Sequence, residues 1–290
     1  MSRCAELAES AADPLEASAP PAARWVLVEH PGPWGRRALS GSGLDRDVAT
    51  ALGSWADLVA GRVALIRRRA SAHRAGSHRR WFVVDSRPGH ESVRSGSYVD
   101  ERELVDVIDD PSAGEPVDPP LYLVCTHGRH DTCCAVRGRP VAAALAAEYP
   151  ERTWECTHVG GDRFAANLVV LPHGLYYGHL PPGSAVDVAR RHDEGLLDPR
   201  WLRGRSSLPA AVQAAQHHAR RATGECGVDA FAPQKIESTA AGEWLVRLAG
   251  ADGELAVRVR ERIRDSGRPL TCAAVSPGRI RTYDLVALTS

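Results

Sequence analysis

Cysteine, histidine and aspartate residues are concentrated in two short blocks of this 290-residue chain. The first block runs from Cys125 to Cys134 and directly follows the apolar stretch 121–124. The second block contains His158 and Asp162, which are separated by Val-Gly-Gly. Thiolates, imidazoles and carboxylates are the donors that hold metal ions and iron–sulfur clusters in proteins. Few other functions need such a set, so the two blocks predict a metal centre.

The first block lies where α/β folds build their sites. We expect residues 121–124 to form a strand, which places Cys125 at its carboxyl end. A helix is expected over 139–148, with Pro140 near its first turn. Cys134 lies shortly before that helix, where the positive end of the helix dipole favours a thiolate. The polar loop between the two cysteines can bring both thiols to one centre. The alternative is that both are buried and behave as small apolar residues.

The second block is built around a glycine turn. Gly160 and Gly161 can adopt a positive φ, which allows a tight bend. Such a bend can bring His158 and Asp162 to one point without a helix. Alternatively, His158 bonds a backbone carbonyl and Asp162 caps the turn. The paired cysteines nearby favour the interpretation of His158 as a ligand.

The surrounding elements predict an α/β fold. A β-α-β opening, a β-hairpin and a helix follow one another in each half, with a proline-containing linker over 110–120. We expect two related thioredoxin-like units, over 24–110 without ligands and over 121–290 with a C-terminal extension. Residues 1–23 are rich in Ala, Ser, Pro and Glu, and we expect a disordered tail there. Expected strands are 25–29, 62–66, 81–84, 121–124, 153–157, 168–171, 175–179, 243–248, 255–259 and 283–288. Expected helices are 45–59, 102–109, 139–148, 184–195 (capped by Ser184) and 208–222.

Composition excludes several classes of partner. The chain has 36 basic and 36 acidic residues, so no excess of positive charge favours nucleic acid. The arginine cluster over 67–80 is expected to be a solvated loop. No apolar run is long enough to span a bilayer, and the N-terminus does not resemble a signal peptide. We therefore expect a cytoplasmic protein, where thiols stay reduced and clustered cysteines serve metal or redox chemistry.

The same blocks resemble those of the sucrase/ferredoxin-like family of thioredoxin-like ferredoxins. The matching segments are Cys125-Thr-His and Asp131-Thr-Cys133-Cys134, Thr157-His158-Val-Gly-Gly-Asp162-Arg-Phe-Ala-Ala-Asn167, Glu29-His-Pro-Gly-Pro-Trp-Gly35, and Leu171-Pro-His-Gly-Leu-Tyr-Tyr-Gly178. The resemblance implies a [2Fe-2S] cluster held by two cysteines and two histidines. Carried over, these ligands fall on Cys125, Cys134, His158 and Asp162, where the last position departs from the histidine of the family.

The departure leaves the fourth ligand open. A carboxylate is a harder donor than an imidazole. We rank Asp162 first, followed by Cys156 and Cys272, with Cys133 as a further alternative. Within the first block, His127 and His130 could donate hydrogen bonds to the cluster, and Arg129 could neutralise its charge. Their alternative role is that of solvent-facing loop residues.

The resemblance implies an electron carrier rather than an enzyme. Such a protein would pass single electrons between a reductase and an acceptor, neither of which the sequence identifies. A second hypothesis is a mononuclear zinc module, because two cysteines, a histidine and an aspartate suit tetrahedral Zn²⁺. A third is a metal-free thiol redox protein, although the chain has no Cys-x-x-Cys motif.

Overall fold

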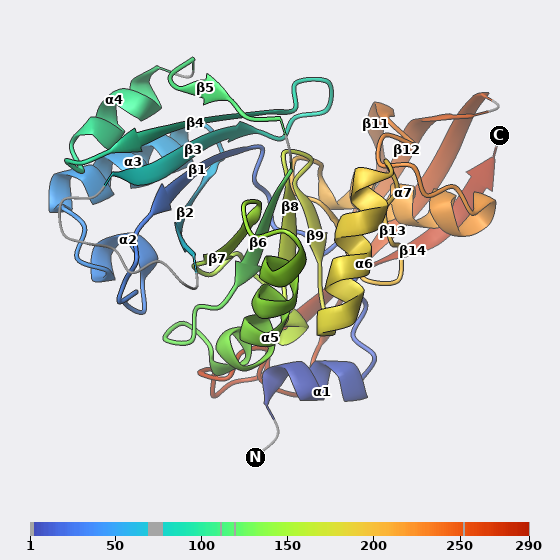
Figure 1. Ribbon diagram of the computed structural model, residues 1–290. Coiled ribbons are helices and arrows are strands. Elements are labelled where there is room, and N and C mark those ends of the chain that lie inside the picture. Colours follow the sequence, from blue (N-terminus) through green and yellow to red (C-terminus); the bar gives the residue numbers. More distant parts are fainter. Residues whose placement is uncertain (1–2, 69–77, 111, 119, 252, 290) are drawn as a thin grey trace.

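Ten strands form one mixed sheet through the middle of the molecule (Figure 1). The structure is a computed structural model that describes residues 3–68, 78–110, 112–118, 120–251 and 253–289. The strands follow the order β10-β9-β8-β6-β7-β2-β1-β3-β4-β5. Their bounds are β1 (Arg24–Glu29), β2 (Arg62–Arg67), β3 (Arg79–Asp85), β4 (Ser92–Tyr98), β5 (Glu115–Pro116), β6 (Leu121–Cys125), β7 (Thr153–Cys156), β8 (Leu168–Leu171), β9 (Leu175–Tyr177) and β10 (Leu202–Arg205). The helices are α1 (Cys4–Ser10), α2 (Ala38–Gly41), α3 (Arg46–Leu58), α4 (Glu103–Asp109), α5 (Thr132–Glu148), α6 (Pro182–Asp193) and α7 (Ala210–Thr223), with a 3₁₀ turn η1 (Asp162–Phe164).

The two halves of this sheet have the same internal order. In the first half, β1 and β2 are parallel and joined by α3, β3 runs antiparallel to β1, and β4 runs antiparallel to β3. In the second half, β6 and β7 are parallel and joined by α5, β8 runs antiparallel to β6, and β9 runs antiparallel to β8. The α/β, thioredoxin-like fold class is confirmed. That the halves are two related units over 24–110 and 121–290 stays a prediction.

The halves are joined through β2 and β7, which pair antiparallel with Ile66 opposite Cys156. The two strands overlap only at their carboxyl ends, in the middle of the sheet. Beside this junction, the Thr157 N–H donates to the carbonyl of Leu65 over 2.9 Å. The Arg67 guanidinium lies 2.8 Å from the Glu155 carboxylate. Both halves therefore contribute to the surroundings of the second cysteine- and histidine-bearing block.

Burial on both faces explains why the central strands are almost wholly apolar. In β6, Tyr122 and Val124 pack in one core with side chains of α5 and α6. Leu123 and Cys125 point to the opposite face and pack in a second core. A strand that is covered on both sides has no solvent-facing positions to fill with polar residues. This is the property that made strands such as β1 and β6 predictable from the sequence.

The helix after Cys125 is longer than expected. α5 begins at Thr132 rather than near residue 139, because the Asp131 side chain accepts a hydrogen bond from the Cys133 N–H over 2.8 Å and caps the helix. Pro140 therefore lies inside the helix, and its expected first-turn position is wrong. The expected cap of α6 at Ser184 is wrong too, since that helix begins at Pro182.

The expectation of a disordered tail over 1–23 is also wrong for much of this segment. Residues 4–10 form α1, in which Cys4, Ala5 and Ala8 are buried. Further along, the Ala22 N–H donates to the carbonyl of Ser206 over 2.9 Å. The small buried side chains of α1 allow close packing with few large apolar residues. The amino-acid composition of this segment therefore does not reveal that it is ordered.

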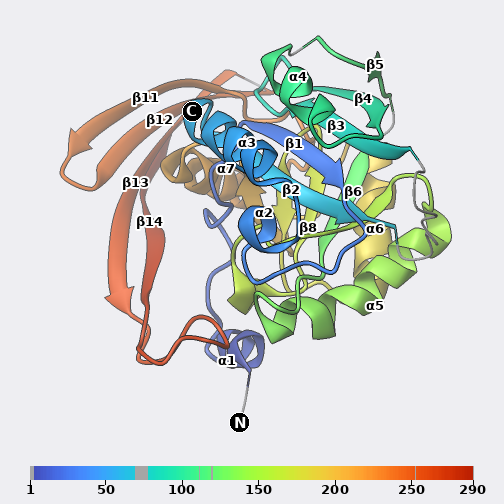
Figure 2. The same cartoon turned by 90° about the vertical axis from the view of Figure 1, so that its left-hand side faces the viewer.

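The C-terminal part adds a second sheet of four antiparallel strands, in the order β11 (Pro233–Ala240), β12 (Glu243–Gly250), β13 (Gly253–Asp265) and β14 (Arg279–Thr289). Helix α7 packs against this sheet. The β13–β14 hairpin is long, and Figure 2 shows its tip beside α1. There the Arg268 guanidinium donates to the carbonyl of Leu7 over 3.4 Å.

Two further predictions concern the arginine cluster over 67–80 and membrane-spanning helices. The central part of the arginine cluster, 69–77, lies outside the described residues. Of its flanks, Arg67 pairs with Glu155 and Arg68 with Glu151. Among the residues that the structure describes, no helix combines the length and apolar character needed to cross a bilayer.

Candidate metal centre

Strand β6 and helix α5 hold the two cysteines of the first block. Cys125 is the last residue of β6 and Cys134 lies in the first turn of α5. Both are almost completely buried, at 1% and 0% exposure. The helix lies close to the strand end, since a Cβ at Gly138 would overlap the carbonyl oxygen of Cys125. Strand and helix thereby bring the two thiols together.

The glycine turn after β7 carries the second block. Gly160 and Gly161 have φ of 99° and 84°, the left-handed region that glycine tolerates. Neighbouring groups leave no room for a side chain at either position. A Cβ at Gly160 would meet Pro20, and one at Gly161 would meet the guanidinium of Arg203. The bend brings His158 and Asp162 together, with the His158 Nδ1 3.0 Å from the Asp162 Oδ1.

The structure brings all four predicted ligands into one place. Cys125, Cys134 and His158 each offer one donor atom, and these three atoms lie within 4.8 Å of one another. The Asp162 Oδ1 lies 3.4 Å from the Cys134 Sγ. A dinuclear cluster takes four protein ligands, and the site offers a pair of thiols and a histidine–aspartate pair. The donor set thus fits such a cluster in number and type, with a carboxylate in the fourth place.

The pKa values of Cys125, Cys134 and His158 are shifted in different directions. The hydrogen bond from Cys134 and the nearby His158 hold the pKa of the Cys125 thiol well below its usual range. The same hydrogen bond, together with burial, raises the pKa of Cys134. Burial acts to lower the pKa of His158, but Asp162 and the Cys125 thiolate outweigh it and raise this pKa to about 9. These shifts favour the charged forms of Cys125 and His158, which lie beside each other in the buried site.

The three residues predicted to surround the donors, His127, His130 and Arg129, differ in burial and in contacts. His127 is buried, its Nε2 donates to the carbonyl of Gly35 over 2.6 Å, and its Nδ1 accepts from the His158 N–H over 3.2 Å. Burial lowers the pKa of His127, which suits this neutral tautomer. His130 stacks on His158 with ring centroids 3.7 Å apart. Arg129 is exposed. His127 thus orients the backbone of His158, and the first half contributes through Gly35.

The three alternative ligands lie elsewhere. Cys156 is fully buried beside Cys125 in the next strand, but among the described residues it belongs to no group of three close donors. Cys133 and Cys272 lie in a separate group with Cys4 and Asp131. Sequence reasoning missed Cys4 altogether, since its only signal was a cysteine within a segment expected to be disordered. Asp131 had been recognised only as part of the polar loop.

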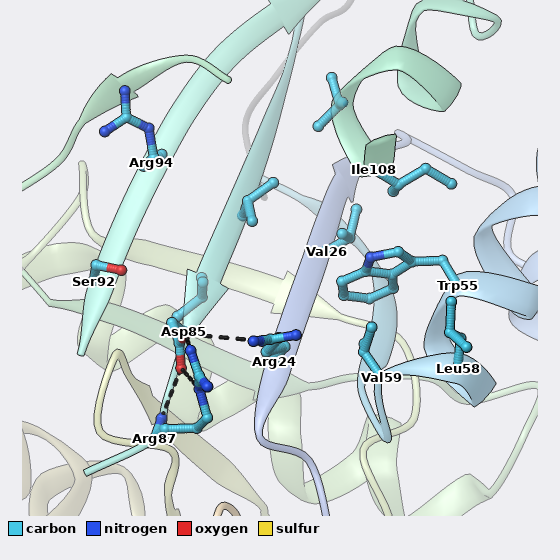
Figure 3. A pocket seen from close by; sticks show the side chains of 13 residues that line it. Arg24, Val26, Trp55, Leu58, Val59, Asp85, Arg87, Ser92, Arg94 and Ile108 are labelled. Atoms are coloured by element: carbon cyan, nitrogen blue, oxygen red, sulfur yellow. Dashed lines mark hydrogen bonds and ion pairs between the residues drawn. The ribbon is translucent and has the colours of Figure 1, made fainter. Parts of the chain in front are cut away.

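One pocket of the first half lies apart from these donors. Figure 3 shows a pocket of about 320 Å³ lined by β1, β3, β4, α3 and α4. Arg24 and Asp85, at the amino end of β1 and the carboxyl end of β3, form an ion pair beside it. The donors lie beyond the carboxyl ends of β6 and β7, away from this end of β1. The pocket therefore has no part in the metal centre.

Comparisons with known proteins identify the family of this chain. A family model described as Sucrase/ferredoxin-like matches residues 15–204. The thioredoxin-like [2Fe-2S] ferredoxin from Aquifex aeolicus is 18% identical, covering 32% of this chain and 97% of that chain at a TM-score of 0.29. A cysteine-to-serine variant of that ferredoxin is 19% identical, covering 29% of this chain and 96% of that chain at a TM-score of 0.26. No curated protein matches. Since the family model spans more than half of the sequence, the chain belongs to the sucrase/ferredoxin-like family.

Proposed function

We propose that this protein carries single electrons on a [2Fe-2S] cluster bound by Cys125, Cys134, His158 and Asp162. The observation that carries the proposal is the convergence of these four side chains at the carboxyl ends of β6 and β7. Membership of the sucrase/ferredoxin-like family supports it. The bound cluster would supply a one-electron redox couple, and the neutral imidazole of His158 in place of a thiolate would raise its potential.

The protein's own residues would shape that site in two ways. Buried Cys125 and Cys134 keep water from the thiolate side. His158 retains 20% of its side-chain surface, and His130 stacked on it retains 36%. His158 is the most exposed of the four proposed ligands, so we place the contact with a redox partner protein beside it. The identity of the donor and acceptor is left to experiment.

The deciding experiment is anaerobic purification followed by visible absorption and analysis of iron, sulfide and zinc. We expect a coloured protein with about two irons and two sulfides per chain. Cys125→Ser and Cys134→Ser should each lose the cluster. Cys156→Ser is the matched control, because Cys156 is equally buried in the neighbouring strand and should leave the iron content unchanged. Full iron content in both ligand variants would refute the assignment.

The fourth ligand has its own test. Asp162→His should restore the histidine of the family pattern and shift the absorption and electron paramagnetic resonance spectra. Asp162→Ala should weaken cluster retention. Unchanged spectra in both variants would exclude Asp162 as a ligand and point to an alternative such as Cys156.

The same analysis separates the two competing functions. One zinc per chain that is lost in Cys125→Ser would establish a mononuclear module at this site. A protein with no metal after cluster reconstitution would favour the thiol redox function, which the low pKa of the Cys125 thiol supports. Against that function, Cys125 is only 1% exposed, so a substrate disulfide has little access to it.

A further inference from the structure

A second group of thiols lies on the far side of the α5 N-terminus. Cys133 follows Asp131 and precedes the predicted ligand Cys134, but it points into a different cluster with Cys4 and Ala5. Cys272, from the tip of the β13–β14 hairpin, joins them. Three segments that are far apart in the sequence therefore bring three thiols and one carboxylate within 4.8 Å of one another.

The distances fit one tetrahedral ion. The Sγ of Cys4 lies 3.6 Å from that of Cys133 and 3.5 Å from that of Cys272, and the Cys133 and Cys272 sulfurs are 3.4 Å apart. Around a tetrahedral zinc with Zn–S bonds of ~2.3 Å, neighbouring sulfurs would be about 3.8 Å apart. A disulfide needs sulfurs at ~2.05 Å. All three cysteines are free.

Asp131 supplies the fourth donor and fixes the arrangement. Its Oδ1 accepts from the Cys133 N–H over 2.8 Å, and its Oδ2 accepts from the Cys272 N–H over 2.7 Å. The same two oxygens lie 3.7 and 3.8 Å from the Cys4 Sγ. Asp131 is 3% exposed. The carboxylate thus connects the backbones of two cysteines and faces the third, and it still has lone pairs for a metal.

We propose that Cys4, Cys133, Cys272 and Asp131 bind one Zn²⁺ ion, in a structural site separate from the proposed cluster. Three thiolates and a carboxylate match the ligand types and the coordination number that zinc takes in closed sites. The ion would join α1, the start of α5 and the β13–β14 hairpin. This inference does not depend on the proposed cluster, since the two sites share no ligand.

A path for the metal is present. A hollow of about 310 Å³ lies against Cys4 and Cys272, between α1 and the hairpin tip. Cys272 is exposed, whereas Cys4 and Cys133 are buried. In the metal-free protein, burial raises the pKa of Cys4, and it raises that of Cys133 to about 11. Zinc binding must therefore release thiol protons, so the affinity should increase with pH.

The test measures zinc and iron separately in the full chain, purified under reducing conditions. We expect one zinc per chain in the wild-type protein, and a cobalt(II) form with the spectrum of tetrahedral thiolate coordination. Cys272→Ser should lose the zinc and leave the iron content unchanged, and Cys4→Ser should do the same. Cys226→Ser is the matched control, because this cysteine belongs to neither donor group. Competition with a chromophoric chelator gives the affinities.

Asp131→Asn tests the role of the carboxylate as a zinc ligand separately from its role as the cap of α5, because asparagine also caps helices. We expect it to lower the zinc affinity roughly 10- to 100-fold while α5 stays intact by circular dichroism. Three results would each overturn the proposal. These are zinc retained by both cysteine variants, reduced wild-type protein that binds neither zinc nor cobalt, and a disulfide among the three cysteines in the freshly purified chain. A wild-type protein that binds zinc at this site but no iron would instead count against the proposed cluster.

Discussion

Replacing Arg203 with methionine should destabilise the protein and loosen the turn that carries His158. Arg203 lies in β10 and is 1% exposed. Its guanidinium donates to the carbonyl of Gly160 over 2.9 Å and to the Asn167 Oδ1 over 2.7 Å. It also donates to the carbonyl of Ser18 over 2.6 Å and to the Ser18 Oγ over 3.0 Å. One side chain therefore holds the glycine turn, the end of the second block and the N-terminal segment.

The magnitude follows from these contacts. Arg203→Met removes a buried cation, whose desolvation partly offsets its hydrogen bonds. It also leaves the buried Asn167 Oδ1 without this donor, at a cost of ~1–3 kcal/mol, and removes the donor from three part-buried oxygens, which should cost less. Breaking one partner of a buried charged network typically costs about 3–5 kcal/mol. We therefore expect the free energy of unfolding to fall by about 4 kcal/mol. Arg203→Lys keeps the charge but lacks the planar fork that reaches all the acceptors, so we expect roughly half of that loss.

Urea unfolding followed by circular dichroism measures the change, with the slope checked against the wild type. Arg200→Met is the matched control. Arg200 lies three residues earlier, and its side chain is 70% exposed in an ion pair with Asp198. That variant should lose less than about 1 kcal/mol. If Arg203→Met lost no more than Arg200→Met, the buried guanidinium would not hold these segments together, and the reasoning would be refuted.

Two further predictions concern the core. Gly138→Ala places a Cβ against the carbonyl of Cys125, so we expect the free energy of unfolding to fall by about 3 kcal/mol and the iron content to decrease. Gly183→Ala is the control, because the space at its Cβ is open and neither quantity should change. Equal losses of stability for the two variants in urea unfolding would contradict this prediction. Burial lowers the pKa of His192 to about 4 and also lowers that of His173, which it contacts over 3.1 Å. A depressed histidine pKa means that the unfolded chain binds the proton first, so stability should decrease as the pH falls from about 6.5 toward 4, by on the order of 3 kcal/mol. His192→Gln should flatten this decrease in thermal unfolding, and an unchanged pH profile would show that His192 titrates normally.

The sequence predicted the buried strands better than the exposed ones. β1 and β6 are covered on both faces and so consist of apolar runs. β4 (Ser92–Tyr98) and β11 (Pro233–Ala240) are largely polar and were missed, since each is held by pairing with neighbouring strands that no local pattern reveals. The predicted start of α5 is too late because proline is typical of a first helical turn, whereas Pro140 lies inside this helix.

The candidate metal centre was predictable because its donors follow strand ends. Cys125 ends β6 and His158 follows β7, and because these strands are adjacent and parallel, the convergence of the two residues follows from the topology. The second thiol group gave no such signal. Cys4 and Cys272 lie 129 and 139 residues from Cys133 in the sequence, and only the docking of α1 and the hairpin brings them to it.

The antiparallel junction of β2 with β7 also covers part of a strand edge. Without the first half, β7 would expose unpaired backbone groups next to Cys156, which could recruit a strand from another molecule. In the intact chain, β2 pairs with Glu155 and Cys156 at this edge. The N-terminal half thus acts as a tethered partner strand beside the candidate metal centre.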